Sequence, residues 1–323
     1  MKLRMFLSRQ VLTCVILLIF YLQPGFSQGK VSSDSKQPGL FFGIGLEPSL
    51  SQVKNLGVQY SSDLTSTKKF ALSGSLEFGY SFSRYFGISS GLSYSSYNTQ
   101  LNVGLYQNHL ASIDQDNENY DLRVSGSDIN EIQQIGIIGI PICLNFRVPF
   151  KSDMGFFIQT GINIAVPLRN NYTTSGNFTY KGYFSQYNVV LEDLPGYGFS
   201  TELPTETDGK LQLKPLINCA LASIGFDYII QKRIQISVAA LFTKSLESIS
   251  EYIPNENYQL STGQNQLNSL MEGSSNVILQ SFGFNIGVRY YITDFSKNKY
   301  YSKRKHNMYL KEDSRGEKIY IEQ

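Results

Sequence analysis

The chain has 323 residues, enough for one large domain or two domains of average size. A net charge of +2 and only 17 % charged residues exclude the strongly basic surface that nucleic-acid-binding proteins carry. No nucleic-acid partner is therefore expected.

The amino terminus has the three parts of an export signal. Basic residues, the last of them Arg9, precede an apolar run from Val11 to Leu22, and the small-residue stretch QPGFSQGK follows. This order is typical of a cleavable signal peptide, and the run is too short to span a bilayer comfortably. We expect residues 1–27 to be a signal peptide and residues 28–38 a short periplasmic segment.

The rest of the chain alternates between large and small residues in eight segments. The clearest is KFALSGSLEFGYSF, Lys69 to Phe82. A period of two predicts a β-strand with two unlike faces. Helical periodicity is not convincing after the signal. The other seven segments are Gly39–Leu50, Tyr85–Tyr97, Ile135–Val148, Gly155–Leu168, Leu216–Ile230, Arg233–Thr243 and Gln280–Ile292.

The connections between these segments alternate between short and long. The stretches SRY, PFKSDM and QK make the short joins, whereas residues 51–68, 98–134, 169–215 and 244–279 make long polar ones. An outer-membrane barrel has this asymmetry, with short periplasmic turns and longer outer loops. The predicted fold class is therefore all-β: an eight-stranded antiparallel up-and-down transmembrane β-barrel with long extracellular loops. We place it at residues 39–293, in the outer membrane.

The bulky face of each segment is predicted to contact lipid. Eight such faces could not all fit inside one small soluble barrel. A Lys or Arg at the lipid-facing midplane costs about 2 to 4 kcal/mol, and every charge within the spans lies on the small, polar face. Phe70 and Phe82 should therefore face lipid, and Ser73 the lumen. The predicted lumen charge cluster is Glu47, Glu77, Arg147, Asp227 and Arg289.

This cluster has two interpretations. The first is a structural plug of buried, paired charges, because the interior of an eight-stranded barrel is filled by side chains. The second is a path for protons or a small solute. Cys143 and Cys219 are expected on strands that are not neighbours, at different heights, as buried fillers rather than a disulfide.

Three further features bear on the strands. Pro141 removes a ladder hydrogen bond from a central strand, and we expect a β-bulge to absorb it. Asn218 would face lipid near the start of its strand, which suggests a β-bulge or a shifted start there. Aromatic residues at the short-turn end predict an interfacial girdle. They are Tyr80, Phe82, Tyr85, Phe86, Phe146, Phe150, Phe156, Phe226, Tyr228, Tyr290 and Tyr291.

Several stretches together resemble a known family. They are SLEFGYSFSRYFGISSGLSYS, IGIPICLNFRV, MGFFIQTGINIAVPL and FGFNIGVRYYIT, within Gly39 to Ile292. They are similar to the outer-membrane β-barrel domain family of Bacteroidota that includes PorT. In that family an inward Pro and a following basic residue precede a Gly-rich strand, as Pro141 and Arg147 do here. The family's usual acidic residue two positions before the Pro is Gly139. The resemblance implies the barrel fold and, as an alternative role, that of an accessory of type IX secretion.

The second long connection contains an acidic loop. Its residues Asp114, Asp116, Glu118 and Asp121 follow His109. Oxygen ligands at alternate positions suggest a calcium loop, but the glycine and final glutamate of an EF-hand are missing, which favours a solvated acidic loop. His109 beside carboxylates would also suit a hydrolase at the barrel rim, provided that a nucleophile and an orienting group lie in reach.

Two regions could recognise partners. The stretch NNYTTSGNFTYKGYFSQYN suits adaptable surface recognition and, equally, strands that extend beyond the membrane. The basic tail, residues 294–323, is expected to be a flexible periplasmic extension or a docking segment.

The sequence as a whole predicts a non-enzymatic outer-membrane protein. Its expected role is structural or one of interaction through long loops, with no catalytic residue, metal site or cofactor. The alternatives are an accessory of an envelope or type IX secretion complex, a small-solute channel and a loop-based hydrolase. Expected partners are outer-membrane lipid and envelope or secretion-complex proteins.

Overall fold

The computed structural model describes residues 39–58, 63–151, 153–230, 233–252, 258–263, 266–292, 309–312 and 318–321. These residues are mainly strands, with one short 3-10 helix, η1 (Pro195–Tyr197). Within these ranges, no helix is long and apolar enough to cross a membrane. The strands are β1 (Gly39–Val58), β2 (Thr65–Ser81), β3 (Phe86–Ile113), β4 (Asn119–Pro149), β5 (Met154–Phe184), β6 (Val189–Leu191), β7 (Ser200–Lys210), β8 (Ile217–Ile230), β9 (Ile234–Ser245), β10 (Ser261–Gly263), β11 (Gln266–Leu267), β12 (Ser274–Tyr291), β13 (Tyr309–Glu312) and β14 (Lys318–Ile321).

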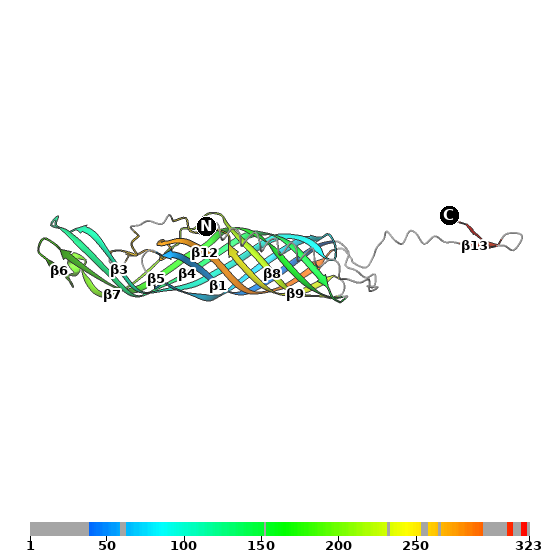
Figure 1. Ribbon diagram of the computed structural model, residues 1–323, viewed down its shortest axis with the longest axis horizontal. Coiled ribbons are helices and arrows are strands. Elements are labelled where there is room, and N and C mark those ends of the chain that lie inside the picture. The colour runs from blue at the N-terminus through cyan, green and yellow to red at the C-terminus, as the bar shows by residue number, and fades with distance from the viewer. Residues whose placement is uncertain are drawn as a thin grey trace, which may run out of the picture. The chain divides into compact units, whose positions relative to one another are not determined.

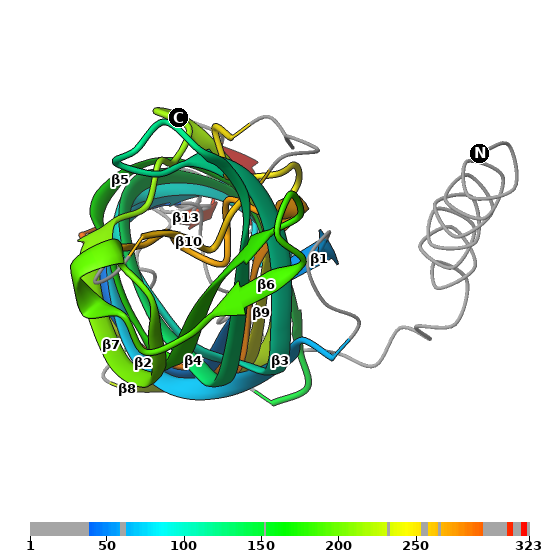
Figure 2. The ribbon, with the colours of Figure 1, turned by 90° about the vertical axis from the view of Figure 1, so that its left-hand side faces the viewer.

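Eight of the described strands close into an antiparallel ring (Figures 1 and 2). The order is β1, β2, β3, β4, β5, β8, β9 and β12, and β12 pairs back with β1 from Phe41↔Tyr291 to Val58↔Ser274. A closed ring pairs its backbone groups internally, as a lipid environment requires. Each of the eight predicted segments matches one of these strands to within one residue or lies inside it, so the predicted barrel is confirmed.

The orientation of the faces is also confirmed. Phe78, Ile140 and Phe284, from three different walls, are 55 %, 55 % and 56 % exposed. Ser73 and Ser93 are buried inside the ring. Large apolar side chains therefore cover the outside of the barrel, where lipid lies, and small polar ones face the lumen.

The aromatic girdle is present with one exception. Pairs such as Phe82–Phe86 and Phe86–Phe146 bring their ring centroids to 5.6 and 5.2 Å at the short-turn end. Tyr291, however, is buried in the lumen against Phe41, at a centroid distance of 5.3 Å. Its assignment to the girdle was wrong because Tyr290 and Tyr291 are consecutive, and consecutive strand residues point to opposite faces.

The second and third long connections are largely strand rather than loop. β3, β4 and β5 are 28, 31 and 31 residues long, and β3 pairs with β4 up to Ile113↔Asn119. β2 pairs with β3 only up to Asn102, so β3, β4 and β5 continue beyond the ring, where β6 and β7 join β5. We call this part of the sheet the extension. The extension confirms the interpretation that the third long connection contains strands that continue beyond the membrane. It also shows that β3, β4 and β5 were predicted too short.

Pro141 is accommodated without the predicted bulge. The pairs Ser90↔Ile142 and Ser93↔Gly139 on either side of it keep one register between β3 and β4. Toward β5 the nearest irregularity falls between Gly136 and Ile137. The bulge prediction was wrong because a ladder can lose one hydrogen bond without gaining a residue. The strand that contains Asn218 is regular as well.

A segment between β9 and β12 folds into the ring. It comprises residues 258–263 and 266–272, with the small β10–β11 sheet, and we call it the inner plug. Figure 2, which looks into the ring, shows β10 inside it. Leu260 and Leu270 are 0 % exposed and pack in one cluster with Tyr106 and Phe178 of the extension.

The two ends of the sequence are described only in part. The predicted signal peptide, residues 28–38 and the join Gln231–Lys232 lie outside the described residues. In the predicted tail, β13 and β14 pair antiparallel from Tyr309↔Ile321 to Glu312↔Lys318, and the remaining tail residues lie outside the described ranges.

Candidate functional site

The lumen contains two ion pairs near the short turns. In the first, Nε of Arg147 on β4 lies 2.9 Å from Oδ1 and 2.7 Å from Oδ2 of Asp227 on β8, and Nη2 lies 2.6 Å from Oδ1. The Asp227 side chain is fully buried. Such multiple charge-assisted contacts are among the stronger hydrogen bonds in proteins.

The second ion pair joins β2 and β12, the two strands on either side of β1. Nε of Arg289 on β12 lies 2.7 Å from Oε2 of Glu77 on β2, and Nη2 lies 2.9 Å from Oε1. Gln159 on β5 donates to Oε1 of Glu77 at 3.1 Å, and Nη2 of Arg289 donates to Oδ1 of Asn145 on β4 at 3.4 Å. These bonds cross the lumen and fill it.

Each ion pair straddles one strand, and a glycine of that strand lies between the partners. Gly43 on β1 pairs with both Glu77 and Arg289. Gly155 on β5 pairs with Asp227, and a Cβ built on it would lie 2.6 Å from Cζ of Arg147. The missing side chain gives Arg147 its path across β5, because the backbone can be approached closely only at glycine.

Replacing Gly155 with valine should therefore break the Arg147–Asp227 pair. The β-branched side chain would occupy the position of the guanidinium and leave Asp227 buried without its partner, at a cost of about 3 kcal/mol. The measurement is the urea midpoint of the barrel in lipid vesicles, followed by the gel mobility of unheated samples. Gly104→Val is the matched control, because a Cβ at Gly104 meets nothing within 4 Å. Equal midpoints for the two variants would contradict the role of Gly155.

Aromatic rings close the lumen at the same level. Phe41, Phe157 and Tyr291 are buried, and the guanidinium of Arg289 lies 5.1 Å from the ring centroid of Phe41. The hydroxyl of Tyr291 donates to Oε1 of Gln235 at 2.7 Å. Rings and ion pairs together narrow the lumen at the short-turn end.

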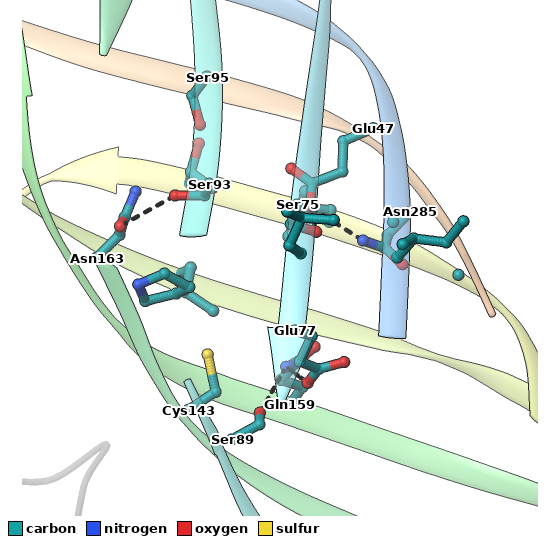
Figure 3. A pocket seen from close by; sticks show the side chains of 18 of the residues that line it. Glu47, Ser75, Glu77, Ser89, Ser93, Ser95, Cys143, Gln159, Asn163 and Asn285 are labelled. Carbon is teal, nitrogen blue, oxygen red and sulfur yellow. Dashed lines mark hydrogen bonds between the residues drawn. The ribbon is translucent and has the colours of Figure 1, made fainter. Parts of the chain in front are cut away.

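A small chamber of about 80 Å³, lined by both polar and apolar side chains, lies in the lumen (Figure 3). Glu47 accepts hydrogen bonds there from Oγ of Ser75 at 3.2 Å and Nδ2 of Asn285 at 3.0 Å. Oγ of Ser93 donates to Oδ1 of Asn163 at 3.2 Å. A space of this size has room for several water molecules, which these polar groups can bind.

Both described cysteines line this chamber as free, buried thiols. Cys143 is on β4 and Cys219 on β8, with β5 between them, as predicted. Their heights differ by two residues along β5, since Cys143 pairs with Gly161 and Cys219 with Asn163.

An apolar layer covers the end of the chamber nearer the extension. Val53, Ile137 and Leu279 come from the barrel wall, and Leu211 and Met271 come from the connections that fold inward. All five are nearly inaccessible to solvent. The chamber is therefore separated from the cell surface by a packed apolar layer.

Glu131 on β4 holds the inner plug from inside the barrel wall. Its side chain is buried, with Oε1 accepting from Nε2 of Gln133 at 2.6 Å and Oγ of Ser269 at 2.8 Å. Oε2 accepts from Oγ1 of Thr174 at 2.7 Å and from the backbone N–H of Leu270 at 2.6 Å. Burial raises the pKa of this carboxyl, and the four hydrogen bonds oppose the rise. Two of the four donors belong to the plug.

The acidic loop forms the turn between β3 and β4. Oδ1 of Asp114 accepts from the backbone N–H groups of Asp116 and Glu118, at 2.9 and 2.8 Å. Oε1 of Glu118 accepts from the hydroxyl of Tyr187 at 2.6 Å. Among the described residues, no group of three His, Cys, Asp or Glu side chains could hold a metal ion.

His109 and Asp121 do come together, as a hydrolase would require. Nδ1 of His109 lies 3.1 Å from Oδ2 of Asp121, and the same oxygen accepts from Nε of Arg123 at 3.2 Å. No serine or cysteine side chain in the described part of the chain hydrogen-bonds to His109. Within the described residues, the pair therefore has an orienting carboxylate but no hydroxyl or thiol hydrogen-bonded to the imidazole.

Sequence comparison identifies the family. A family model described as "Outer membrane protein beta-barrel domain" matches residues 26–251. The chain belongs to the outer membrane protein beta-barrel domain family. No curated protein matches the sequence.

Solved structures similar to this barrel domain are also outer-membrane proteins. The outer membrane protein OprG from Pseudomonas aeruginosa is 13 % identical, with 81 % of this chain and 99 % of that chain covered and a TM-score of 0.38. Neisserial surface protein A is 10 % identical, with 77 % and 96 % covered and a TM-score of 0.31. Ail, the attachment invasion locus protein of Yersinia pestis, is 10 % identical, with 78 % and 99 % covered and a TM-score of 0.28.

The structure of this family member adds residues to the predicted cluster. All five predicted charges lie in the lumen, where four form the two ion pairs and Glu47 lines the chamber. Phe41, Phe157 and Glu131 were missed. Phe41 and Phe157 alternate with lipid-facing residues, so the period-two pattern of their strands would have placed them in the lumen. Glu131 lay in a stretch that was interpreted as a loop.

Proposed function

We propose that this protein is a non-conducting outer-membrane barrel whose extension binds another protein of the envelope or cell surface. The observation that carries the proposal is the continuation of β3, β4 and β5 as one paired sheet beyond the ring, as far as Asp121↔Tyr183. A barrel with only a structural role needs no such sheet, because short connections would close it. Ordered strands also lose less entropy than loops when a partner binds.

The outward surface of the extension has the composition of a recognition surface. We call it the outer face of the extension and define it as Leu105, His109, Ile113, Asp121, Arg123, Lys181, Tyr183 and Glu192. Cζ of Arg123 lies 4.1 Å from the ring centroid of Tyr183, and Nζ of Lys181 lies 2.7 Å from Oε1 of Glu192. Leu105 and Ile113 are 55 % and 65 % exposed. Fixed Arg and Tyr side chains beside exposed apolar groups are typical of interface centres.

The alternatives receive less support. A channel would have to pass the ion pairs, the apolar layer and the inner plug. A hydrolase would need a nucleophile beside His109, and Arg123 already occupies the carboxylate that would orient the imidazole. The resemblance to the PorT-like proteins of Bacteroidota makes components of a secretion complex the first partners to test.

Site-specific photo-crosslinking in native membranes tests the proposed interaction. A photoreactive residue at Gln107, exposed on the same strand face as His109, should yield adducts with another protein. The same group at the lipid-facing Phe78 is the matched control and should yield none. If neither Gln107 nor Lys181 gives a protein adduct, the extension has no protein partner under those conditions and the proposal is wrong.

Planar-bilayer recording tests the non-conducting barrel. The purified protein is expected to give no ionic conductance above that of the bare bilayer, because side chains fill the lumen at several levels. The refolded state of the same sample is checked by gel mobility without heating. Reproducible single-channel steps from folded protein would favour the small-solute channel instead.

A further inference from the structure

Two parallel rows of side chains cross the outside of four adjacent strands, β9, β12, β1 and β2. The first row is apolar and consists of Phe242, Phe282, Leu50 and Phe70, which are paired in register and exposed. Two residues further along each strand lies the second row, Lys244, Gln280, Gln52 and Lys68. Lys244 pairs with Gln280 and Gln280 with Gln52. Lys68 lies beside Gln52, since the preceding pair is Ser51↔Lys69.

The second row marks the outer boundary of the lipid-facing band. The apolar row ends the run of large hydrophobic side chains, and the row beyond it is polar and nearer the extension. Lys54, two residues beyond Gln52, pairs with Ile278 and lies on the same side of the sheet. Lysine side chains at this level keep their stems on apolar surface and place the ammonium among lipid headgroups. The three lysines thus lie at the level of the outer leaflet's headgroups.

The charge at this position is not balanced by the protein. β9 and β12 contain no acidic residue, and the only ones on β1 and β2, Glu47 and Glu77, point into the lumen. Within the described ranges, Lys54, Lys68 and Lys244 form no ion pair. Lys181 and Lys214, in contrast, are paired with Glu192 and Glu247 at 2.7 and 3.2 Å. These three lysines are therefore available to a counter-charge from outside the protein.

We propose that Lys54, Lys68 and Lys244 form a binding site for the phosphate groups of an anionic lipid of the outer leaflet. Three strand spacings, a distance of about 14 Å, separate Lys244 from Lys68. One headgroup with several phosphates, or two adjacent headgroups, can therefore contact both lysines. Gln280 lies between the two lysines in the same row, whereas Gln52 is buried and its amide donates to Ser66. The acyl chains of such a lipid would lie over Phe242, Phe282, Leu50 and Phe70. Charge complementarity and continuity with the lipid-facing band favour this occupant over a protein.

Native mass spectrometry of the detergent-solubilised full chain tests the site. The probes are phosphatidylglycerol as the anionic lipid, phosphatidylcholine as the uncharged control and inorganic phosphate as a soluble competitor. The double variant Lys68→Gln/Lys244→Gln should bind phosphatidylglycerol about 25-fold more weakly, since each lysine near an anionic surface is worth roughly a factor of five. Binding of phosphatidylcholine should not change.

The matched control is Lys181→Gln/Lys214→Gln, which removes two lysines already paired with carboxylates. It should retain the affinity of the unsubstituted protein for phosphatidylglycerol. Equal loss in both double variants would indicate attraction by net charge and overturn the site, as would no loss in Lys68→Gln/Lys244→Gln. Displacement of the lipid by millimolar inorganic phosphate would overturn the assignment to a lipid.

Discussion

Replacing Asp227 with alanine is expected to destabilise the barrel by about 3 to 5 kcal/mol, because it leaves the Arg147 guanidinium buried without a counter-charge. The Arg147 side chain is 11 % exposed, and its guanidinium donates three hydrogen bonds to the carboxylate of Asp227. The measurement is equilibrium urea unfolding in lipid vesicles, with the folded fraction determined from the mobility of unheated samples.

Two further variants separate the cost of an unpaired charge from the value of the pair. Arg147→Met/Asp227→Leu removes both charges and should recover most of the lost stability, since replacing a buried ion pair by apolar residues is often neutral. Glu192→Ala removes one partner of an exposed ion pair and should cost about 1 kcal/mol or less. Equal stability of Asp227→Ala and the unsubstituted protein would show that water reaches Arg147 and that this level of the lumen is open.

The lipid-facing half of the fold could be predicted because the membrane imposes a strong constraint. Period-two alternation and the confinement of charges to one face placed Phe78 and Ile140 outside and Glu77 inside. The extension obeys no such rule. Its strands carry polar residues on both faces, as in the consecutive Gln107 and Asn108 of β3, so the alternation weakens where lipid ends and strand cannot be distinguished from loop.

The sequence could predict which side chains lie in the lumen, but not which of them form ion pairs with one another. The period-two alternation assigned four charged residues to the interior: Arg147, Asp227, Glu77 and Arg289. Which of them pair depends on the register of strands that are distant in sequence. Gly43 and Gly155 offered a weak signal, because a glycine on the inner face marks close approach. The position of Glu131 could not be inferred, since its partners Ser269 and Leu270 come from a connection that folds back into the ring.

Replacing Glu131 with alanine is expected to release the inner plug and expose the chamber to the cell surface. The substitution removes the acceptor for Oγ of Ser269 and for the backbone N–H of Leu270, and leaves these buried donors unsatisfied. The apolar layer includes Met271, which follows directly in the sequence, so movement of the plug would open this layer too. The ion pairs near the short turns do not involve the plug and should keep the other end closed.

The native cysteines report on this change without an added probe site. Cys143 and Cys219 are 3 % and 1 % exposed and should react slowly with a membrane-impermeant maleimide in the unsubstituted protein. Glu131→Ala should raise the labelling rate at least about tenfold, since a thiol that opens to water loses the protection of burial. Cys143→Ser and Cys219→Ser assign the labelled thiol. Glu118→Ala, which removes a carboxylate at the tip of the extension, is the control and should leave both thiols protected. A folded Glu131→Ala barrel with unreactive thiols would mean that apolar packing of Leu260 and Leu270 holds the plug without the carboxylate.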